Sequence, residues 1–458
     1  MKRLIGKILP WHMTPAIFAL AWPTMLEEMT HTAVQYIDTA MVGSLGTQAT
    51  AAVGATSTVN WLISSTISAV GVGFLAFVSR SCGAGDYNRA KKAASQAVLA
   101  VLFCGILFTV LTLGLSGVIP VWMQVDPAIR ELASTYFFVL YSPMLARTAI
   151  IIFGTLLRSV GDTKTPMRVG LLVNAANVIL NFFLIYPTRK IAGITIWGAG
   201  MGVIGAATAS AASFLLGGIS ITIALWRHPL ISPKGQFLRV DWDILKPCLK
   251  VALPNGFQRF GTSLGYVAFA AMINSLGDVS TAAHTIANTV ESAFYIPGYG
   301  MMTAAATLAG NCLGARDNRK VKDLARMILF IEAGLMILSG SLLYVFAPNM
   351  MRLFSKDPQV ISLGATVLRM VAVSEPFYGV SIIIEGLMQG MGNTVLPFLF
   401  SISGMWAIRI VGTFICTQLL GLGLVSALGC MIAHNLMLFV MFMACYLTGK
   451  WNPMHKKV

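Results

Sequence analysis

Four polar side chains share one face of the first long apolar segment of the chain. They are Glu27, His31, Gln35 and Asp38. At about 100° per residue in a helix, the last three lie within about 80° of Glu27 and form a polar stripe about 16 Å long. Because a charged group at the centre of a membrane helix costs about 2.5–3.5 kcal/mol, the stripe must line a cavity or meet polar groups of another helix.

The same stripe could move protons along the helix. Histidine exchanges protons readily near neutral pH, and His31 lies between Glu27 and Asp38. The pattern is equally compatible with a proton relay and with a hydrated wall that only shapes a cavity.

A second polar face is predicted in VNAANVILNFFLIYP, where Asn174, Asn177 and Asn181 follow i, i+3, i+7 spacing. Carboxylate and amide oxygens are hard ligands suited to Na⁺, and the same groups could hold a carboxyl that takes up a proton. Asp38 is the candidate carrier, because it lies deep in its apolar segment. The alternative is that the asparagines only bond helices together, as polar groups often do in membranes.

The composition indicates what kind of element must carry these residues. Of 458 residues 56% are hydrophobic and 11% are charged, against about 25% charged in an ordinary soluble domain. This excludes a disordered chain and argues against a soluble enzyme. No GxxxxGK[ST] or HExxH motif is present, so we expect no enzyme activity, and transport energy would come from an ion gradient. Seven scattered cysteines predict neither a metal site nor a disulfide framework.

Twelve apolar runs are long enough to cross a bilayer as helices. The sequence therefore predicts an all-α integral membrane protein with spans at roughly 16–42, 49–78, 93–118, 133–157, 169–187, 199–226, 251–275, 280–309, 327–347, 361–388, 396–420 and 424–447.

Basic residues are distributed unevenly between the two sides of these spans. The side that holds both termini carries 23 Lys and Arg, and the other side carries five. Since cytoplasmic loops are enriched in Lys and Arg, both termini are predicted to be cytoplasmic. The net charge of +15 is then explained by topology, and nucleic-acid binding is not expected.

The chain also repeats itself at a shift of 231 residues. The shift superposes a series of landmarks: Pro23 on Pro254, Met41 on Met272, Asp126 on Asp357 and Gly161 on Gly392. Each half then carries six spans, and an even number makes the repeats parallel. We expect a first lobe over 1–226, a cytoplasmic linker over 227–250 and a second lobe over 251–458.

The second half lacks the first half's polar set. Asp38 becomes Phe269 at the repeat shift, and Asn181 becomes Gly412. The second half has other ionisable groups within its spans: Arg259, His284, Glu291, Glu332, Glu375, Glu385 and Arg409. We expect some of them to form Glu–Arg pairs with a structural role, so that Glu332→Gln should matter less than loss of the asparagines.

Several motifs resemble the MATE family of multidrug and toxic compound extrusion transporters, in its prokaryotic form. They include WPTMLEEMTHTAVQYIDTAMVGSLGTQATAAVGA, CGAGDYNRAKKA, LLRSVGDTKTPM, NVILNFFLIYP with GVIGAATASAAS, and in the second half LPNGFQRF, LGDVSTAAHTIANTV and GNCLGARD. The resemblance implies two six-helix bundles that export organic cations and amphipathic drugs in exchange for Na⁺ or H⁺. It also implies a cation site at Asp38 of IDTAMVG, with Asn177, Asn181 and Thr208 as partners.

The resemblance has departures and leaves alternatives. One branch of the family has an acidic residue where Asn181 stands, and another has a glutamate where Thr262 stands. The same superfamily includes lipid-linked precursor flippases, and an ion channel or receptor is the alternative from another class. We expect a monomeric, multi-pass protein of the inner (plasma) membrane whose partners are drugs and lipid, with no cofactor beyond the coupling ion.

Overall fold

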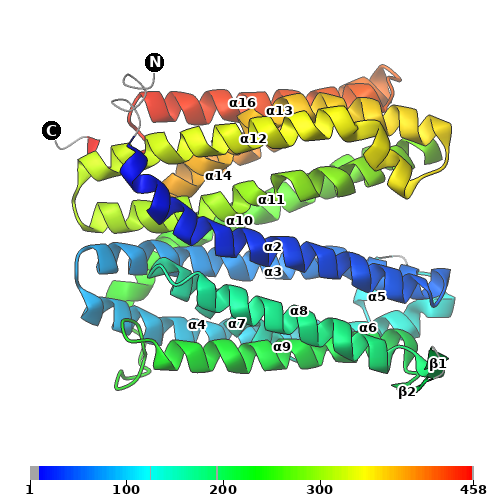
Figure 1. Cartoon of the computed structure of the whole chain (residues 1–458), viewed down its shortest axis with the longest axis horizontal. Helices are drawn as coiled ribbons and strands as arrows, with labels where there is room; N and C mark the ends of the chain where they lie inside the picture. The colour runs from blue at the N-terminus through cyan, green and yellow to red at the C-terminus, as the bar shows by residue number, and fades with distance from the viewer. Residues whose placement is uncertain (1–9, 124, 192–193, 456–458) are drawn as a thin grey trace. The chain divides into compact units, whose positions relative to one another are not determined.

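A computed structural model describes residues 10–123, 125–191 and 194–455, and this part of the chain is nearly all helical (Figure 1). Five of the basic residues counted above, Lys2, Arg3, Lys7, Lys456 and Lys457, lie outside it. The elements in chain order are η1 (Trp11–Met13), α2 (Thr14–Gly43), α3 (Thr47–Gly83), α4 (Tyr87–Gly114), α5 (Ile119–Trp122), η2 (Pro127–Ile129), α6 (Arg130–Tyr141), α7 (Met144–Ser159), α8 (Lys164–Leu184), β1 (Pro187–Ile191), β2 (Ile194–Ala199), α9 (Gly202–Arg227), α10 (Trp242–Asn274), α11 (Asp278–Gly314), α12 (Asn318–Phe354), α13 (Pro358–Gly390), α14 (Val395–Ser403), η3 (Gly404–Ile410), α15 (Val411–Phe414), η4 (Ile415–Leu419) and α16 (Leu424–Leu447).

Each predicted span coincides with a long helix or with a helix built from consecutive segments, which confirms the all-α membrane fold. By length and apolar composition alone, eight helices of the described chain could cross a membrane, or nine if α6 and α7, bent by 49°, form one span. Helices α2, α10 and α11 fall outside this set. In α2 the polar stripe interrupts the apolar sequence, which is the feature that made this helix a candidate for function.

Two local structures differ from a simple run of membrane helices. Between α8 and α9 the chain forms an antiparallel hairpin, in which Arg189 pairs with Ile196 and Lys190 with Thr195. Within 395–419 the helix contains two π-helical segments, η3 and η4. At the start of η3 a Cβ on Gly404 would lie 2.6 Å from Cδ2 of His434, so α16 packs directly on the η3 backbone.

The described chain forms two compact units. One contains residues up to Met25, Leu75–Asp86 and Leu249 onwards, and the other contains Leu26–Phe74 and Tyr87–Cys248. Helices α2 and α3 are thus each divided between the units. These units follow contacts rather than sequence halves, and the lobes predicted at 1–226 and 251–458 stay a prediction.

The first unit has its core where α11, α12 and α13 pack together. Buried side chains there include Leu324 and Ile328 of α12 with Ile383 and Leu387 of α13. Small residues bring the backbones close: a Cβ on Gly340 would lie 2.6 Å from the carbonyl oxygen of Ala372. Such close packing fixes the side chains that point between these three helices.

In the same unit the end of α3 crosses the end of α11 at small residues. A Cβ on Gly83 would overlap the carbonyl oxygen of Asn311, and a Cβ on Gly314 would overlap that of Arg80. Gly83 and Gly314 are equivalent at the repeat shift of 231, and so are Arg80 and Asn311. The crossing is therefore locally two-fold symmetric, because the glycine of each helix contacts the equivalent carbonyl oxygen of the other helix.

Candidate cation site

The predicted carboxylate and asparagines meet between α2 and α8 in the second unit. Asn181, which is almost fully buried, donates from Nδ2 to Oδ1 of Asp38 at 2.6 Å. The two residues are 143 positions apart in the sequence, so the contact depends on the packing of the two helices. A part-buried charged hydrogen bond of this kind holds the carboxylate in one orientation.

Asn177 extends the site by one helical turn. Its amide nitrogen donates to Oδ1 of Asp38 at 2.8 Å, and its oxygen accepts from the Ser210 hydroxyl at 3.0 Å. Asn177 and Asn181 therefore both donate to the Asp38 carboxylate.

This arrangement has the chemistry of a monovalent-cation or proton site. With amide nitrogens turned toward it, the Asp38 carboxylate is stabilised as an anion without any cation. With amide oxygens turned toward it, the same groups supply hard ligands for Na⁺. Protonation of Asp38 would satisfy the site in a third way, because the acid could then donate to an asparagine oxygen.

The other predicted site residues lie apart from this contact. The Thr208 hydroxyl donates to the carbonyl of Ile204 in its own helix at 2.8 Å, and the hydroxyl of α9 that reaches Asn177 is that of Ser210. Ser210 follows Thr208 by about 200° around the helix, so the two cannot face α8 together. Asn174 is half-buried one turn before Asn177, with no hydrogen bond to Asp38 among the described contacts.

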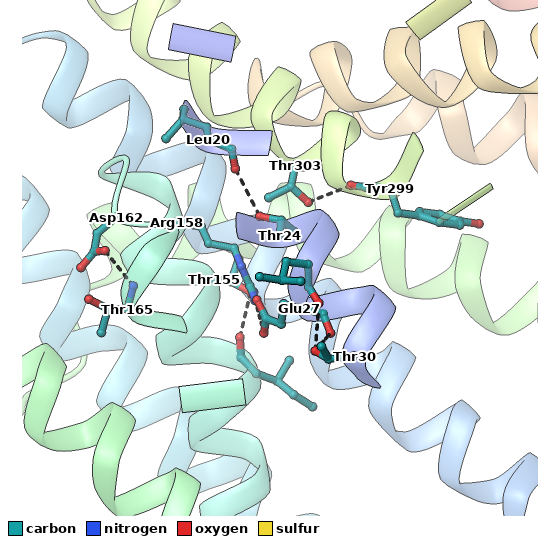
Figure 2. Close-up of polar contacts among 12 residues, drawn as sticks. Leu20, Thr24, Glu27, Thr30, Thr155, Arg158, Asp162, Thr165, Tyr299 and Thr303 are labelled. Carbon is teal, nitrogen blue, oxygen red and sulfur yellow. Dashed lines mark hydrogen bonds and ion pairs between the residues drawn. The ribbon is translucent and has the colours of Figure 1, made fainter. Parts of the chain in front are cut away.

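The far end of the α2 stripe is neutralised by an arginine from α7. Figure 2 shows one guanidinium nitrogen of Arg158 donating to both carboxylate oxygens of Glu27, at 2.7 and 2.6 Å. The two side chains keep 16% and 18% of their surface exposed. Gly170 of α8 leaves room for the pair, since a Cβ there would lie 3.1 Å from Cγ of Glu27. Between the two ends, His31 and Gln35 are exposed in this structure.

The second half has a related polar cluster at the equivalent positions. Gln258 replaces Glu27, Gln389 replaces Arg158 and Ser401 replaces Gly170. Gln258 donates from Nε2 to Oε1 of Glu385 at 2.9 Å and lies 2.9 Å from Oγ of Ser401, while Gln389 donates to the same Glu385 oxygen at 2.8 Å. An ion pair in the first half thus corresponds to a carboxyl held by two amides in the second.

The expected Glu–Arg pairs of the second half are not formed as close ion pairs in the described part of the chain. Ion pairs under 4 Å there include Glu27–Arg158 and the surface pair Asp317–Lys320, and neither joins two of the second-half groups named above. Arg259 and Arg409 interact electrostatically with Glu385 and Glu291, respectively, without direct contact. Arg409 instead packs over the rings of Phe269 and Tyr266, at 4.2 and 4.9 Å from their centres.

Known proteins resemble this chain along most of its length. It is 26% identical over 453 residues, which are 98% of this chain and 96% of the relative, to "Probable multidrug resistance protein NorM" of Thermotoga maritima. It is 24% identical to "Multidrug resistance protein MdtK" of Yersinia pseudotuberculosis, with 85% of each chain covered. Among solved structures, an outward-facing conformation of a multidrug resistance MATE family transporter superposes with a TM-score of 0.88 at 22% identity, with 96% of each chain covered.

A protein-family model described as MatE matches the chain twice, at residues 23–183 and 254–415. The two matches begin 231 residues apart, which is the repeat shift found in the sequence. Together they cover well over half of the chain. The resemblance inferred from the sequence motifs is therefore confirmed, and the chain belongs to the MatE family.

Proposed function

We propose that this protein is a secondary active exporter of organic cations and amphipathic drugs, which it exchanges for Na⁺ or H⁺ by alternating access. Membership of the MatE family and the names of the relatives, multidrug resistance proteins, support the substrate class. The observation that carries the coupling is the Asp38 carboxylate within a membrane helix, held at 2.6 Å by the buried Asn181.

The site supports exchange because its charge can change without unfolding. An empty carboxylate is stabilised by the amide nitrogens of Asn177 and Asn181. When Na⁺ or H⁺ neutralises Asp38, those donors are no longer needed, and rotation of either amide would turn its oxygen toward the ion. The free energy of burying the site depends on whether it is neutral or negatively charged. Binding of the ion can therefore favour one transport conformation over the other.

The membrane arrangement follows from charge and repeat. We place the chain in the inner (plasma) membrane with both termini in the cytoplasm, since the 23-to-5 split of basic residues favours that orientation. The two repeats would form lobes over 1–226 and 251–458, joined by 227–250. We propose a monomer without enzyme activity, and no cofactor other than the coupling ion.

Transport by purified protein in liposomes tests this function. Efflux of a fluorescent organic cation should be driven by an imposed Na⁺ gradient, an imposed pH gradient or both, and Asp38→Asn should abolish the driven part. The substitution keeps the size of the side chain and removes the charge that the ion neutralises. Full gradient-driven transport by Asp38→Asn would refute the assignment of the site.

The same liposomes separate the proposed exporter from its alternatives. A channel would pass labelled Na⁺ without any substrate on the opposite side, whereas an exchanger requires it. A flippase would move a lipid-linked precursor and leave the cation inside.

A further inference from the structure

Glu332 is a carboxyl group that the mechanism above does not use. It lies in the middle of α12 and has none of its surface exposed. Both of its oxygens are buried without a hydrogen-bond partner in the described structure. A Cβ on Gly298 of α11 would lie 2.8 Å from Oε1 of Glu332, and one on Gly379 of α13 would lie 3.0 Å from it. Two glycines on neighbouring helices thus make the space in which this carboxyl fits.

A second buried carboxyl lies within electrostatic range of Glu332. Glu375 of α13 is 2% exposed, interacts electrostatically with Glu332 and Glu291, and has an Oε2 atom without a partner in the described structure. Within two helical turns of Gly298 and Gly379 the titratable groups are acidic or phenolic: Glu291, Tyr295 and Tyr299 on α11, and Glu375, Tyr378 and Glu385 on α13. The nearest basic groups along the three helices are further away in sequence: His284 on α11, Arg326 on α12 and Arg369 on α13. The short η1, which also packs on α12, has His12 exposed.

Charge balance distinguishes these two carboxyls from the others in the second half. Arg409 lies in electrostatic range of Glu291, and Arg259 in range of Glu385. Around Glu375 the interacting charges are Glu291 and Glu332, both acidic, and no basic group of the described chain interacts with Glu332. Two buried carboxylates within electrostatic range of each other, with no basic partner, cannot both stay ionised without a neutralising cation.

The surroundings select the cation. Na⁺ is bound by several oxygen ligands at once, but neither carboxyl oxygen of Glu332 has a hydrogen-bond partner in the described structure, and its neighbours include Gly298, Gly379 and the apolar side chain of Met336. A proton needs no further ligands, because it forms a covalent bond with the carboxyl itself. This is the reverse of the Asp38 site, where amides and a hydroxyl line the carboxylate.

We propose that Glu332 and Glu375 form a proton-binding site in the second half of the chain, separate from Asp38 and occupied in the conformation described here. Because Glu332 has no exposed surface, the packing of α11, α12 and α13 must loosen for its proton to reach water. Release and rebinding of the proton at this site would accompany each transport cycle, so the inference rests on the proposed exchange function.

Infrared spectroscopy tests the site without transport. At neutral pH the purified wild-type protein should show the C=O stretching band of protonated carboxylic acids, which shifts in D₂O. Glu332→Gln and Glu375→Gln should each remove part of that band, and Glu131→Gln, on the exposed start of α6, should leave it unchanged. Glu332→Asp keeps a carboxylic acid, so the band should persist at a shifted frequency. This variant replaces Glu332→Gln in the test if the glutamine variant does not fold. A band that is unchanged in all of these variants would overturn the proposal.

Transport then tests the link to exchange. In Glu332→Gln, efflux driven by a pH gradient should fall to the level seen without a gradient, while equilibrium drug binding is retained. If the infrared band is lost but pH-driven efflux is unchanged, the carboxyl is a buried neutral acid and the transport role is wrong. If the wild type shows the band but neither gradient drives efflux, the proposed exporter function fails and the protonation site stands.

Discussion

The ion pair between Glu27 and Arg158 provides a sharp test, because the second half shows what can replace it. At the equivalent positions the chain has Gln258 and Gln389. We predict that Glu27→Gln and Arg158→Gln are each destabilising, and that the double variant, which copies the second half, recovers most of the loss.

The magnitude follows from burial. Removing one partner of a buried ion pair costs about 3–5 kcal/mol, because the other charge is left without compensation. Glu27 and Arg158 keep 18% and 16% of their surface exposed, so water screens part of this cost and about 3 kcal/mol is expected for each single substitution. Two glutamines leave no charge behind, so the double variant should cost only about 1 kcal/mol, which corresponds to a coupling energy of about 5 kcal/mol between the two sites.

The assay is reversible unfolding of the four proteins in mixed micelles, analysed as a double-mutant cycle. The exposed pair Asp317–Lys320, whose atoms lie 3.5 Å apart, is the matched control and should show almost no coupling. If the double variant of the buried pair is as unstable as the two single losses added together, Glu27 and Arg158 do not act as a unit.

Three further predictions concern the site, the packing and the stripe. Asn181→Ala should weaken cation-driven efflux about tenfold or more, since a hydrogen bond to a charged group is worth about 1.5–3 kcal/mol. Thr208→Ala should change efflux little, because the Thr208 hydroxyl bonds within α9. Equal losses of efflux in the two variants would contradict the assignment of Asn181 to the site. Gly390→Ala should lower the melting temperature, because the new methyl group overlaps the carbonyl of Ala306, while Gly334→Ala, with open space around it, should leave the melting temperature unchanged or raise it. If the stripe relays protons, His31→Ala should slow pH-driven efflux much more than it weakens drug binding, and parallel modest losses would instead indicate a hydrated wall.

Helical periodicity predicted the pairing of Asp38 with the asparagines. Polar residues in an apolar helix must find partners, and the i, i+3, i+7 spacing of the asparagines left one face to supply them. The twelve spans were predicted from the same apolar pattern. The hairpin at 187–199 and the π-helical segments were not, since neither leaves a signal in average hydropathy.

The parts of the site that sequence could not show depend on which helices pack together. Glu27 and Arg158 are 131 residues apart, and only the fold identifies Arg158 as the partner. Ser210 was missed because one sequence does not show which face of its helix meets α8, although its spacing from Thr208 means that only one of the two can. Glu332 was expected to be structural, because position 101 of the first half is valine. Its complete burial without a partner changes that expectation.

The crossing of α3 and α11 bears on how such a chain could arise. A contact in which Gly83 meets Asn311 and its equivalent Gly314 meets Arg80 is the kind that two identical chains make across a dimer axis. A gene of half the length would already encode both partners of this contact. Two copies of its six-span product would have the same orientation in the membrane. Joining two copies in one polypeptide removes the requirement that both sides be identical. One copy is then free to keep a carboxylate at position 38 while the other places Phe269 at the equivalent point.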